Sequence, residues 1–236
     1  MGGTLSPRVL VGIAVGGAAL LTTVLIGASL AGGSKPKPEA APPPVAQAES
    51  PLLQGVLQDG ITLGDPNAPV TLVEYADLQC PYCADWARDA FPTIVDEYVR
   101  PGKVRLVFRG LAFIGQDSEY ALRAALAAGE QDRLWNVVHG LFVRQGAENA
   151  GWVTEDLIRS LGKGAGIDAG RMLAETYVPG VERELAAAQA AAQRVGVPGT
   201  PFFQAGPTGG ALRSLRVARL DADSFRSELD RLLGGE

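Results

Sequence analysis

Cysteine and histidine are scarce in this chain, which has two cysteines and one histidine among 236 residues. Two cysteines are too few for the disulfide framework that stabilises small secreted scaffolds. A structural zinc site takes four cysteine or histidine ligands, so Cys80, Cys83 and His139 fall one short. Carboxylates would have to complete a metal site, and no spacing in the sequence indicates one. Metal binding is therefore a minor alternative, and no residue is assigned as a metal ligand.

Basic clusters are missing as well. The chain carries 21 lysine and arginine residues against 26 acidic ones, a formal net charge of −5, and the basic residues are scattered. Nucleic-acid binding requires a concentrated positive surface, so that function has little support. Hydrophobic residues make up 47% and charged residues 20% of the chain, which is ordinary for a globular protein with a packed core.

Charge is absent from residues 9–31, an apolar run of 23 residues that follows a short N-terminal tail, 1–8. A membrane-spanning helix needs about 20 residues, whereas the apolar part of a secretory signal has about 7–15. The run therefore predicts an uncleaved transmembrane helix. The small residues SLA at 29–31 leave a cleaved signal peptide as the alternative. The few basic residues on the two sides nearly balance, so the flanking charge does not fix the orientation.

Residues 32–50 are rich in proline and alanine and show no apolar periodicity. Such a composition is typical of an extended, solvated linker, which would hold a domain away from the bilayer. From residue 51 to residue 236 the pattern becomes globular.

Alternation and run length predict the order of elements in residues 51–236. Apolar, β-branched runs predict an initial strand within 54–64 and strands at 70–75, 103–111, 201–206 and 214–220. Helical spacing predicts a helix over 81–99 that is interrupted near Pro92, a helical block at about 112–196, and a last helix over 221–234. This order predicts an α/β core with a helical insertion.

The two cysteines stand in CPYC, residues 80–83, directly after the strand at 70–75. Cys80 would end a loop at a helix N-terminus, where free N–H groups and the helix dipole favour a thiolate. Pro81 suits the first helical position. Cys83, one turn further in, can reach back to Cys80, which makes Cys80 the nucleophile and Cys83 the resolving thiol. A passive structural bridge is the alternative, although so short a loop constrains the unfolded chain little.

Two further features bear on this pair. Glu74 interrupts an apolar strand six residues before Cys80. If it is buried, it would have a raised pKa and could serve as a proton shuttle. Strand alternation alone also allows Glu74 to face solvent.

Pro201 opens a strand after Thr200, and a cis X–Pro bond is a recurrent feature of such tight turns. A cis Pro201 beside Cys80 would free the Thr200 backbone to pair with an extended peptide.

Glu74, the CPYC motif and the Thr200–Pro201 pair together resemble the thioredoxin superfamily. The stretch LGDPNAPVTLVEYADLQCPYC is similar to the DsbA-like branch of membrane-tethered or secreted bacterial oxidoreductases, and the likeness extends over about residues 60–233. CPYC also occurs in glutaredoxins, whose proline-bearing strand follows the cysteines closely. Here residues 84–200, which number 117, separate Cys83 from Pro201, so the glutaredoxin interpretation is rejected.

The resemblance implies a thioredoxin-like domain with an inserted helical domain. It implies that Cys80 is an exposed nucleophile, Cys83 its buried partner, Glu74 a buried acid, Thr200 a substrate contact and Pro201 a cis-proline facing the cysteines. The dipeptide Pro81-Tyr82 replaces the Pro-His of the best-known oxidases, and tyrosine cannot add the positive charge that stabilises a thiolate.

The predicted function is therefore an extracytoplasmic, membrane-anchored thiol–disulfide oxidoreductase that introduces disulfides into exported proteins. The resemblance implies no cofactor, because the cysteine pair carries the electrons, and it implies a quinone-linked membrane partner that reoxidises the pair. Two alternatives remain open. One is a disulfide reductase or isomerase in the same compartment, and the other is a tethered, non-catalytic interaction domain.

Overall fold

The computed structural model describes residues 51–234. The predicted transmembrane helix at 9–31 and the predicted linker at 32–50 lie outside the described residues. Within 51–234, no helix is long and apolar enough to cross a membrane.

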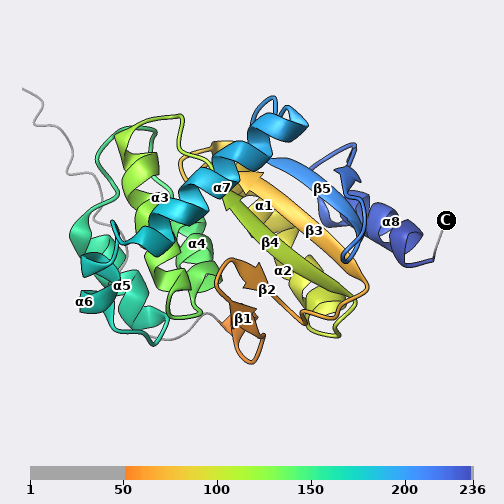
Figure 1. The fold of residues 1–236 in the computed structure, drawn as a ribbon, viewed down its shortest axis with the longest axis horizontal. Coiled ribbons are helices and arrows are strands. Elements are labelled where there is room, and N and C mark those ends of the chain that lie inside the picture. The colour runs from red at the N-terminus through yellow and green to blue at the C-terminus, as the bar shows by residue number, and fades with distance from the viewer. Residues whose placement is uncertain (1–50, 235–236) are drawn as a thin grey trace, which may run out of the picture. The chain divides into compact units, whose positions relative to one another are not determined.

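A mixed sheet forms the centre of the described part (Figure 1), with the strand order β1-β2-β4-β3-β5-β6. The strands are β1 (Gln58–Asp59), β2 (Thr62–Leu63), β3 (Val70–Ala76), β4 (Val104–Gly110), β5 (Phe202–Pro207) and β6 (Arg213–Ser214). The two central strands, β3 and β4, run parallel, and β5 pairs antiparallel with β3. Every residue of β3 is buried, as expected for a strand covered on both faces.

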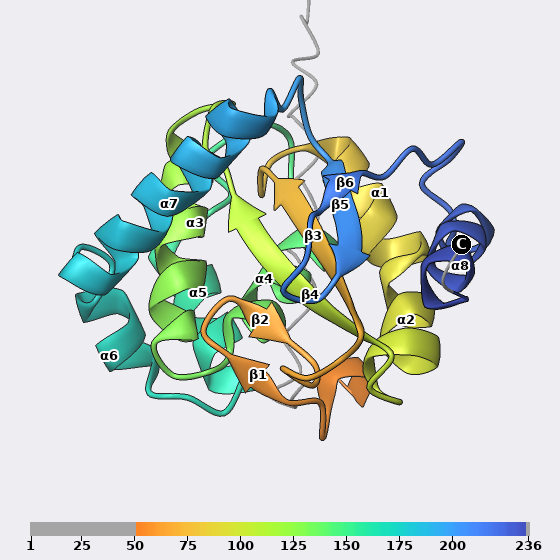
Figure 2. The ribbon, with the colours of Figure 1, turned by 45° about the vertical axis from the view of Figure 1, so that its right-hand side comes forward.

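Helices cover both faces of this sheet, as Figures 1 and 2 show. They are α1 (Pro81–Asp89), α2 (Phe91–Ile94), a π-helical turn (Val95–Val99), α3 (Gln116–Gly129), α4 (Leu134–Val143), α5 (Glu155–Gly164), α6 (Ala169–Ala174), α7 (Pro179–Val195) and α8 (Ala222–Leu233), after a 3-10 turn at Pro51–Leu53. The five helices α3 to α7 all lie between β4 and β5 in the chain, which is where the sequence predicts the helical block. The predicted helix over 81–99 is broken between α1 and α2, two residues before Pro92.

Strand alternation divides the core into two parts. Leu72 and Ala76 of β3 belong to the main core with α1, α2 and α8, whereas Val73 and Tyr75 belong to a smaller cluster with Ala191 and Ala192 of α7. An ion pair of 3.3 Å between Arg109 Nη1 of β4 and Glu184 Oε2 also joins α7 to this second face. Successive side chains of a strand point to opposite faces, so Glu74 shares the main-core face with Leu72 and Ala76.

Two predicted strands differ from the structure. The single strand expected within 54–64 is a short hairpin of β1 and β2, because Gly60 takes a positive φ of 51° and turns the chain. The strand expected at 214–220 ends at Ser214. Ser214 pairs with Gln204 and Arg213 with Ala205. One further backbone hydrogen bond of 2.9 Å, from the Leu215 N–H to the Phe203 carbonyl oxygen, follows this pairing.

Candidate active site

Cys80 lies at the N-cap of α1, directly after the loop that follows β3. Its φ of −70° and ψ of 120° are extended, and the helix begins at Pro81, as the sequence predicts. Proline is tolerated at this position because the first helical N–H has no intrahelical partner. The Cys80 sulfur is therefore placed beside the free N–H groups of the first turn.

The pKa of the Cys80 thiol is lowered from its ordinary value of 9.0 to about 6. The largest cause is a hydrogen bond from the Cys83 thiol. The backbone N–H groups of Cys83 and Tyr82 lower the pKa further, and burial opposes them. At pH 7 a thiol with this pKa is about nine-tenths thiolate, which is the reactive form. Tyr82 thus acts on the sulfur through its backbone, while its side chain is 66% exposed.

Cys83 has the opposite electrostatic environment. Burial raises its pKa far above the ordinary value, and the hydrogen bond to Cys80 and the charge of Glu74 raise it further. Cys83 is 0% exposed and Cys80 is 6% exposed. Cys80 is thus buried in this structure, although the resemblance implies an exposed nucleophile, and it is the more accessible of the two cysteines. Both cysteines are free thiols in this structure.

The segment before β5 lies against the cysteines, although it comes 120 residues later in the chain. The Thr200–Pro201 peptide bond is cis. When it is protonated, the Cys80 thiol donates a hydrogen bond of 3.3 Å to the Thr200 carbonyl oxygen. The structure thus brings together Cys80, Cys83, Thr200 and Pro201, as predicted from the order of motifs.

Glu74 is fully buried on the main-core side of β3. Neither of its carboxylate oxygens has a hydrogen-bond partner among the described residues, and the indole N–H of Trp86 is likewise unpaired. Burial raises the Glu74 pKa well above its ordinary value, and the charge of Cys80 adds to the effect. An unpaired buried carboxylate is costly in its charged form, so Glu74 holds a proton at a pH where an ordinary carboxyl has lost it.

His139 of α4 lines the same small cavity as Glu74 and Trp86. Its ring lies 5.6 Å from that of Phe91, and burial lowers its pKa to about 4. His139 is therefore a neutral, packed side chain at pH 7. Among residues 51–234 no group of three metal-binding side chains is found.

Asp77 is a positioning residue that the sequence reasoning missed. This fully buried carboxylate accepts hydrogen bonds from the backbone N–H groups of Gln79, Phe113 and Ile114 and from the hydroxyl of Ser118. It therefore fixes the loop before Cys80 to the segment after β4 and to α3. An acid in such a loop usually caps a turn or faces water, so Asp77 did not stand out. The sequence signal for a buried Asp77 was the alternation in ADLQC, where polar Asp77 and Gln79 flank an apolar residue.

Comparison with known proteins agrees with this geometry. A family model described as Thioredoxin matches residues 57–208. A curated relative in Bacillus cereus, "Probable disulfide bond formation protein D", is 28% identical over 176 residues, covering 73% of this chain and 78% of the relative. "Disulfide bond formation protein D" of Bacillus subtilis is 31% identical over 129 residues, covering 54% of this chain and 56% of that one.

Solved structures share the fold. Oxidised BdbD from Bacillus subtilis has a TM-score of 0.64 at 23% identity, covering 76% of this chain and 99% of that one. A thioredoxin-like oxidoreductase from Silicibacter pomeroyi has a TM-score of 0.58 at 29% identity, covering 72% of this chain and 90% of that one. The thioredoxin-like α/β fold with helices is thereby confirmed. The chain belongs to the thioredoxin superfamily, and it is similar to DsbA-like proteins named for disulfide bond formation.

Proposed function

We propose that this protein oxidises thiol pairs of exported proteins, with Cys80 as the nucleophilic cysteine and Cys83 as the resolving one. The observation that carries the proposal is the asymmetry of the pair, in which the pKa of Cys80 is lowered to about 6 while that of Cys83 is raised. A low pKa makes Cys80 a good leaving group in its mixed disulfide, which favours release of an oxidised substrate.

The reaction starts from the Cys80–Cys83 disulfide. A substrate thiolate attacks the Cys80 sulfur, which forms a mixed disulfide and breaks the bond to Cys83. A second substrate thiolate then attacks the substrate sulfur of that mixed disulfide, and Cys80 leaves as a thiolate. The substrate loses two electrons to the cysteine pair. Of its two protons, one ends on Cys83 and the other passes to solvent.

Glu74 supplies the proton that Cys83 needs, and it regains one of the two protons that the substrate thiols release. A thiolate at Cys83 is unfavourable because the site is buried, so its departure in the first step requires protonation. Two observations support this role: Glu74 is buried with a raised pKa, and its charged form raises the pKa of Cys83. Thr200 and Pro201 present the backbone edge on which the substrate lies, since the Thr200 carbonyl is 3.3 Å from the Cys80 sulfur.

The protein acts on the extracytoplasmic side of a membrane, to which it is tethered. The uncharged run at 9–31 anchors it in the membrane, and the Pro/Ala-rich linker at 32–50 holds the domain on the extracytoplasmic side. Each catalytic cycle leaves the pair reduced, so an electron acceptor must restore the disulfide. A quinone-linked membrane protein fits this requirement, because an anchored domain meets it in the plane of the bilayer.

The lowered pKa has a defined effect on the potential. At pH 7, a pKa of about 6 instead of 9.0 stabilises the reduced pair by about 1.4 kcal/mol, which makes the disulfide about 30 mV more oxidising. Thioredoxin, with a pKa of about 7, lies near −270 mV, and DsbA, with a pKa of about 3.5, lies near −120 mV. We expect this pair to lie between these values.

The test uses the oxidised full-length protein in a single turnover with a reduced dithiol protein, together with a redox titration against glutathione. Cys80→Ser abolishes oxidation in this proposal, and a Cys80→Ser protein that works at the parent rate would overturn it. A potential at or below about −270 mV would favour the reductase alternative. A Cys80 thiol that alkylates no faster than free cysteine would favour the non-catalytic one.

A further inference from the structure

A narrow cavity lies between α1 and α4, next to the carboxyl group of Glu74. Glu74 and His139 line it together with apolar and aromatic side chains of α1, α2 and α4. Among the described residues that line this cavity, His139 is half-buried, and every other one is at most 2% exposed. The cavity thus joins a fully buried carboxyl group to a histidine side chain that reaches the surface.

The proposed reaction requires Glu74 to exchange protons with solvent. Glu74 gives a proton to Cys83 in the first step, and the reduced pair then carries a thiolate at Cys80. Burial, together with the charge of this thiolate, raises the pKa of Glu74, so Glu74 takes up a new proton while the pair is reduced. Neither Glu74 oxygen has a hydrogen-bond partner among the described residues, and the side chain is 0% exposed. The proton therefore needs a carrier between solvent and Glu74.

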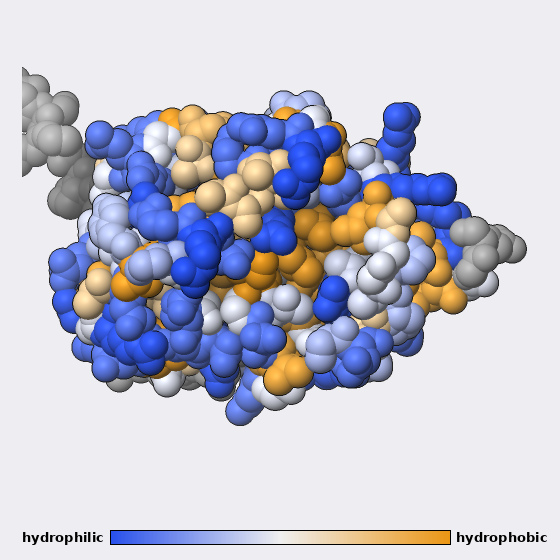
Figure 3. All heavy atoms as spheres, viewed as in Figure 1, coloured by the Kyte–Doolittle hydropathy of each residue, from blue (hydrophilic) through white to orange (hydrophobic). Residues whose placement is uncertain are grey.

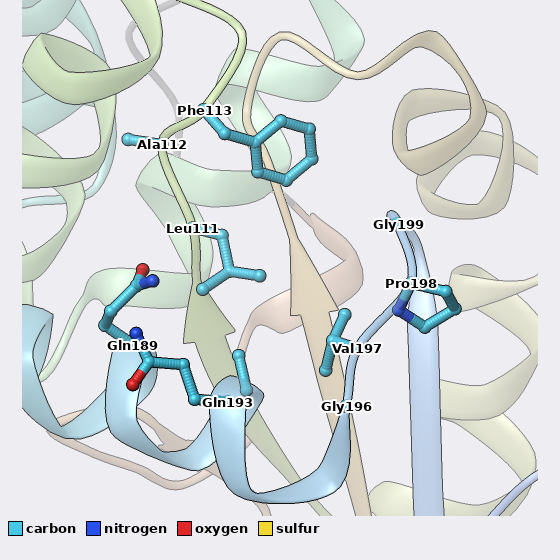
Figure 4. Close-up of a pocket in the computed structure, with 10 residues that line it drawn as sticks. Leu111, Ala112, Phe113, Gln189, Gln193, Gly196, Val197, Pro198 and Gly199 are labelled. Carbon is cyan, nitrogen blue, oxygen red and sulfur yellow. The ribbon is translucent and has the colours of Figure 1, made fainter.

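Two other approaches to Glu74 are closed. Cys83 is 0% exposed, and the substrate covers the cysteine pair while the mixed disulfide exists. The groove of about 330 Å³ beside Thr200 lies on the α7 side of the sheet, and its lining of glutamine and apolar side chains has no titratable group (Figure 4). Apolar residues also reach the surface among hydrophilic ones on the face that carries α7 (Figure 3). Glu74 points to the opposite side of the sheet, into the main core, so this groove does not lead to it.

The His139 side chain has the chemistry of a proton carrier. The cavity has no volume for a water molecule, so a standing chain of water does not span it. A neutral imidazole has one N–H donor and one acceptor nitrogen, and it can therefore accept a proton on one side and release one on the other. Burial and the positive charge of Arg144 lower the pKa of His139 to about 4, so the ring is neutral at rest and readily releases a proton that it has gained.

We propose that His139 is a proton relay between solvent and Glu74. The inference rests on the proposed function, in which Glu74 protonates Cys83, and it adds the route by which Glu74 is recharged. A solvent proton binds one ring nitrogen, and the N–H of the other nitrogen passes its proton to the Glu74 carboxylate, which leaves a neutral ring and a neutral carboxyl group. No electrons move along this route. Before the disulfide re-forms, a proton leaves Glu74 by the reverse path, so that Glu74 can accept the proton of Cys83.

Trp86 assists the charged intermediate of this relay. Its indole N–H is buried in the same cavity and has no partner among the described residues. It can donate a hydrogen bond to the Glu74 carboxylate during the interval in which that group is charged. An unpaired donor and an unpaired carboxyl group in one cavity are thus accounted for together.

The experiment follows protons with a pH-indicator dye after oxidised full-length protein is mixed with an equal amount of a reduced dithiol peptide. The substrate thiols release two protons and Glu74 takes one back, so the parent protein gives a net release of one proton without delay. In His139→Leu we expect both protons to appear first, and the uptake of one to follow at least about tenfold more slowly than in the parent. His139→Gln, whose amide does not accept a proton near neutral pH, should show the same delay. The control Val138→Ala, which changes another residue of this cavity, keeps the parent time course.

A rescue experiment separates proton transfer from packing. His139→Ala leaves a space that free imidazole can enter, so added imidazole should restore fast proton uptake, whereas the larger buffer HEPES at the same concentration should not. In the double variant His139→Leu/Glu74→Gln the delayed uptake should be absent, because the proton acceptor has been removed.

The outcomes distinguish this inference from the proposed function. Fast uptake in His139→Leu and His139→Gln, or a slow uptake in His139→Ala that imidazole leaves unchanged, would overturn the relay while oxidation of the peptide upholds the proposed function. A Glu74→Gln protein that oxidises the peptide at the parent rate would overturn the role of Glu74 in the proposed function, and the relay with it.

Discussion

The hydrogen bond from Cys83 to Cys80 can be tested by a pair of substitutions at one position. It is the largest cause of the lowered Cys80 pKa, which is about 6 instead of 9.0. Cys83→Ala removes the donor, and Cys83→Ser keeps a hydroxyl donor in nearly the same place. We therefore expect the Cys80 pKa to rise by at least about one pH unit in Cys83→Ala and to remain near 6 in Cys83→Ser.

The magnitude follows from the size of the shift. The whole shift of about three pH units corresponds to about 4 kcal/mol of preference for the thiolate, and a hydrogen bond to a charged group contributes about 1.5–3 kcal/mol of it. Loss of this bond alone thus moves the pKa to about 7–8. At pH 6.5, the thiolate fraction of Cys80 then falls from about three-quarters to a quarter or less.

The assay is the rate of alkylation by iodoacetamide across pH, supported by the ultraviolet absorbance of the thiolate. Each variant has a single cysteine, so the signal belongs to Cys80. A Cys83→Ala protein whose alkylation midpoint stays near pH 6 would refute the role of the Cys83 thiol. A Cys83→Ser protein in which Cys80 has the same pKa as in Cys83→Ala would also refute this role, because only the serine variant keeps a hydrogen-bond donor at position 83.

Two further predictions concern buried carboxylates. Glu74 has a raised pKa in the fold, so its contribution to stability is present below its unfolded pKa and is lost as the pH rises through the folded value. Glu74→Gln should abolish this pH-dependent loss in urea unfolding, and it should slow single-turnover oxidation about 100-fold. A variant that is both slower and less stable would contradict this. Asp77→Asn replaces an acceptor oxygen by an amide group that faces other donors, those of Gln79, Phe113, Ile114 or Ser118. This change should lower the free energy of unfolding by about 2–4 kcal/mol. The surface control Asp85→Asn should change it by less than about 0.5 kcal/mol. Equal effects of the two aspartate changes would contradict the proposed network.

Local patterns sufficed for much of the fold. The strands at 70–75 and 103–111 match β3 and β4 because both are runs of β-branched and apolar residues, and a buried strand needs little else. The strand expected at 214–220 failed for a non-local reason. Only Arg213 and Ser214 pair with β5, so the length of this strand depends on its contact with a distant strand and not on its own β-forming residues.

The CPYC motif was enough to predict that Cys80 lies at a helix start, with Pro81 at the first helical position, where the backbone favours a thiolate. The other features of the site depended on tertiary packing. It set which face of β3 carries Glu74, because alternation defines two faces but only packing against α1 decides which is the main core. It showed that Asp77 joins three segments and that Phe113, Gln193 and Pro198 line one groove, because residues far apart in the chain meet only when the sheet and helices pack.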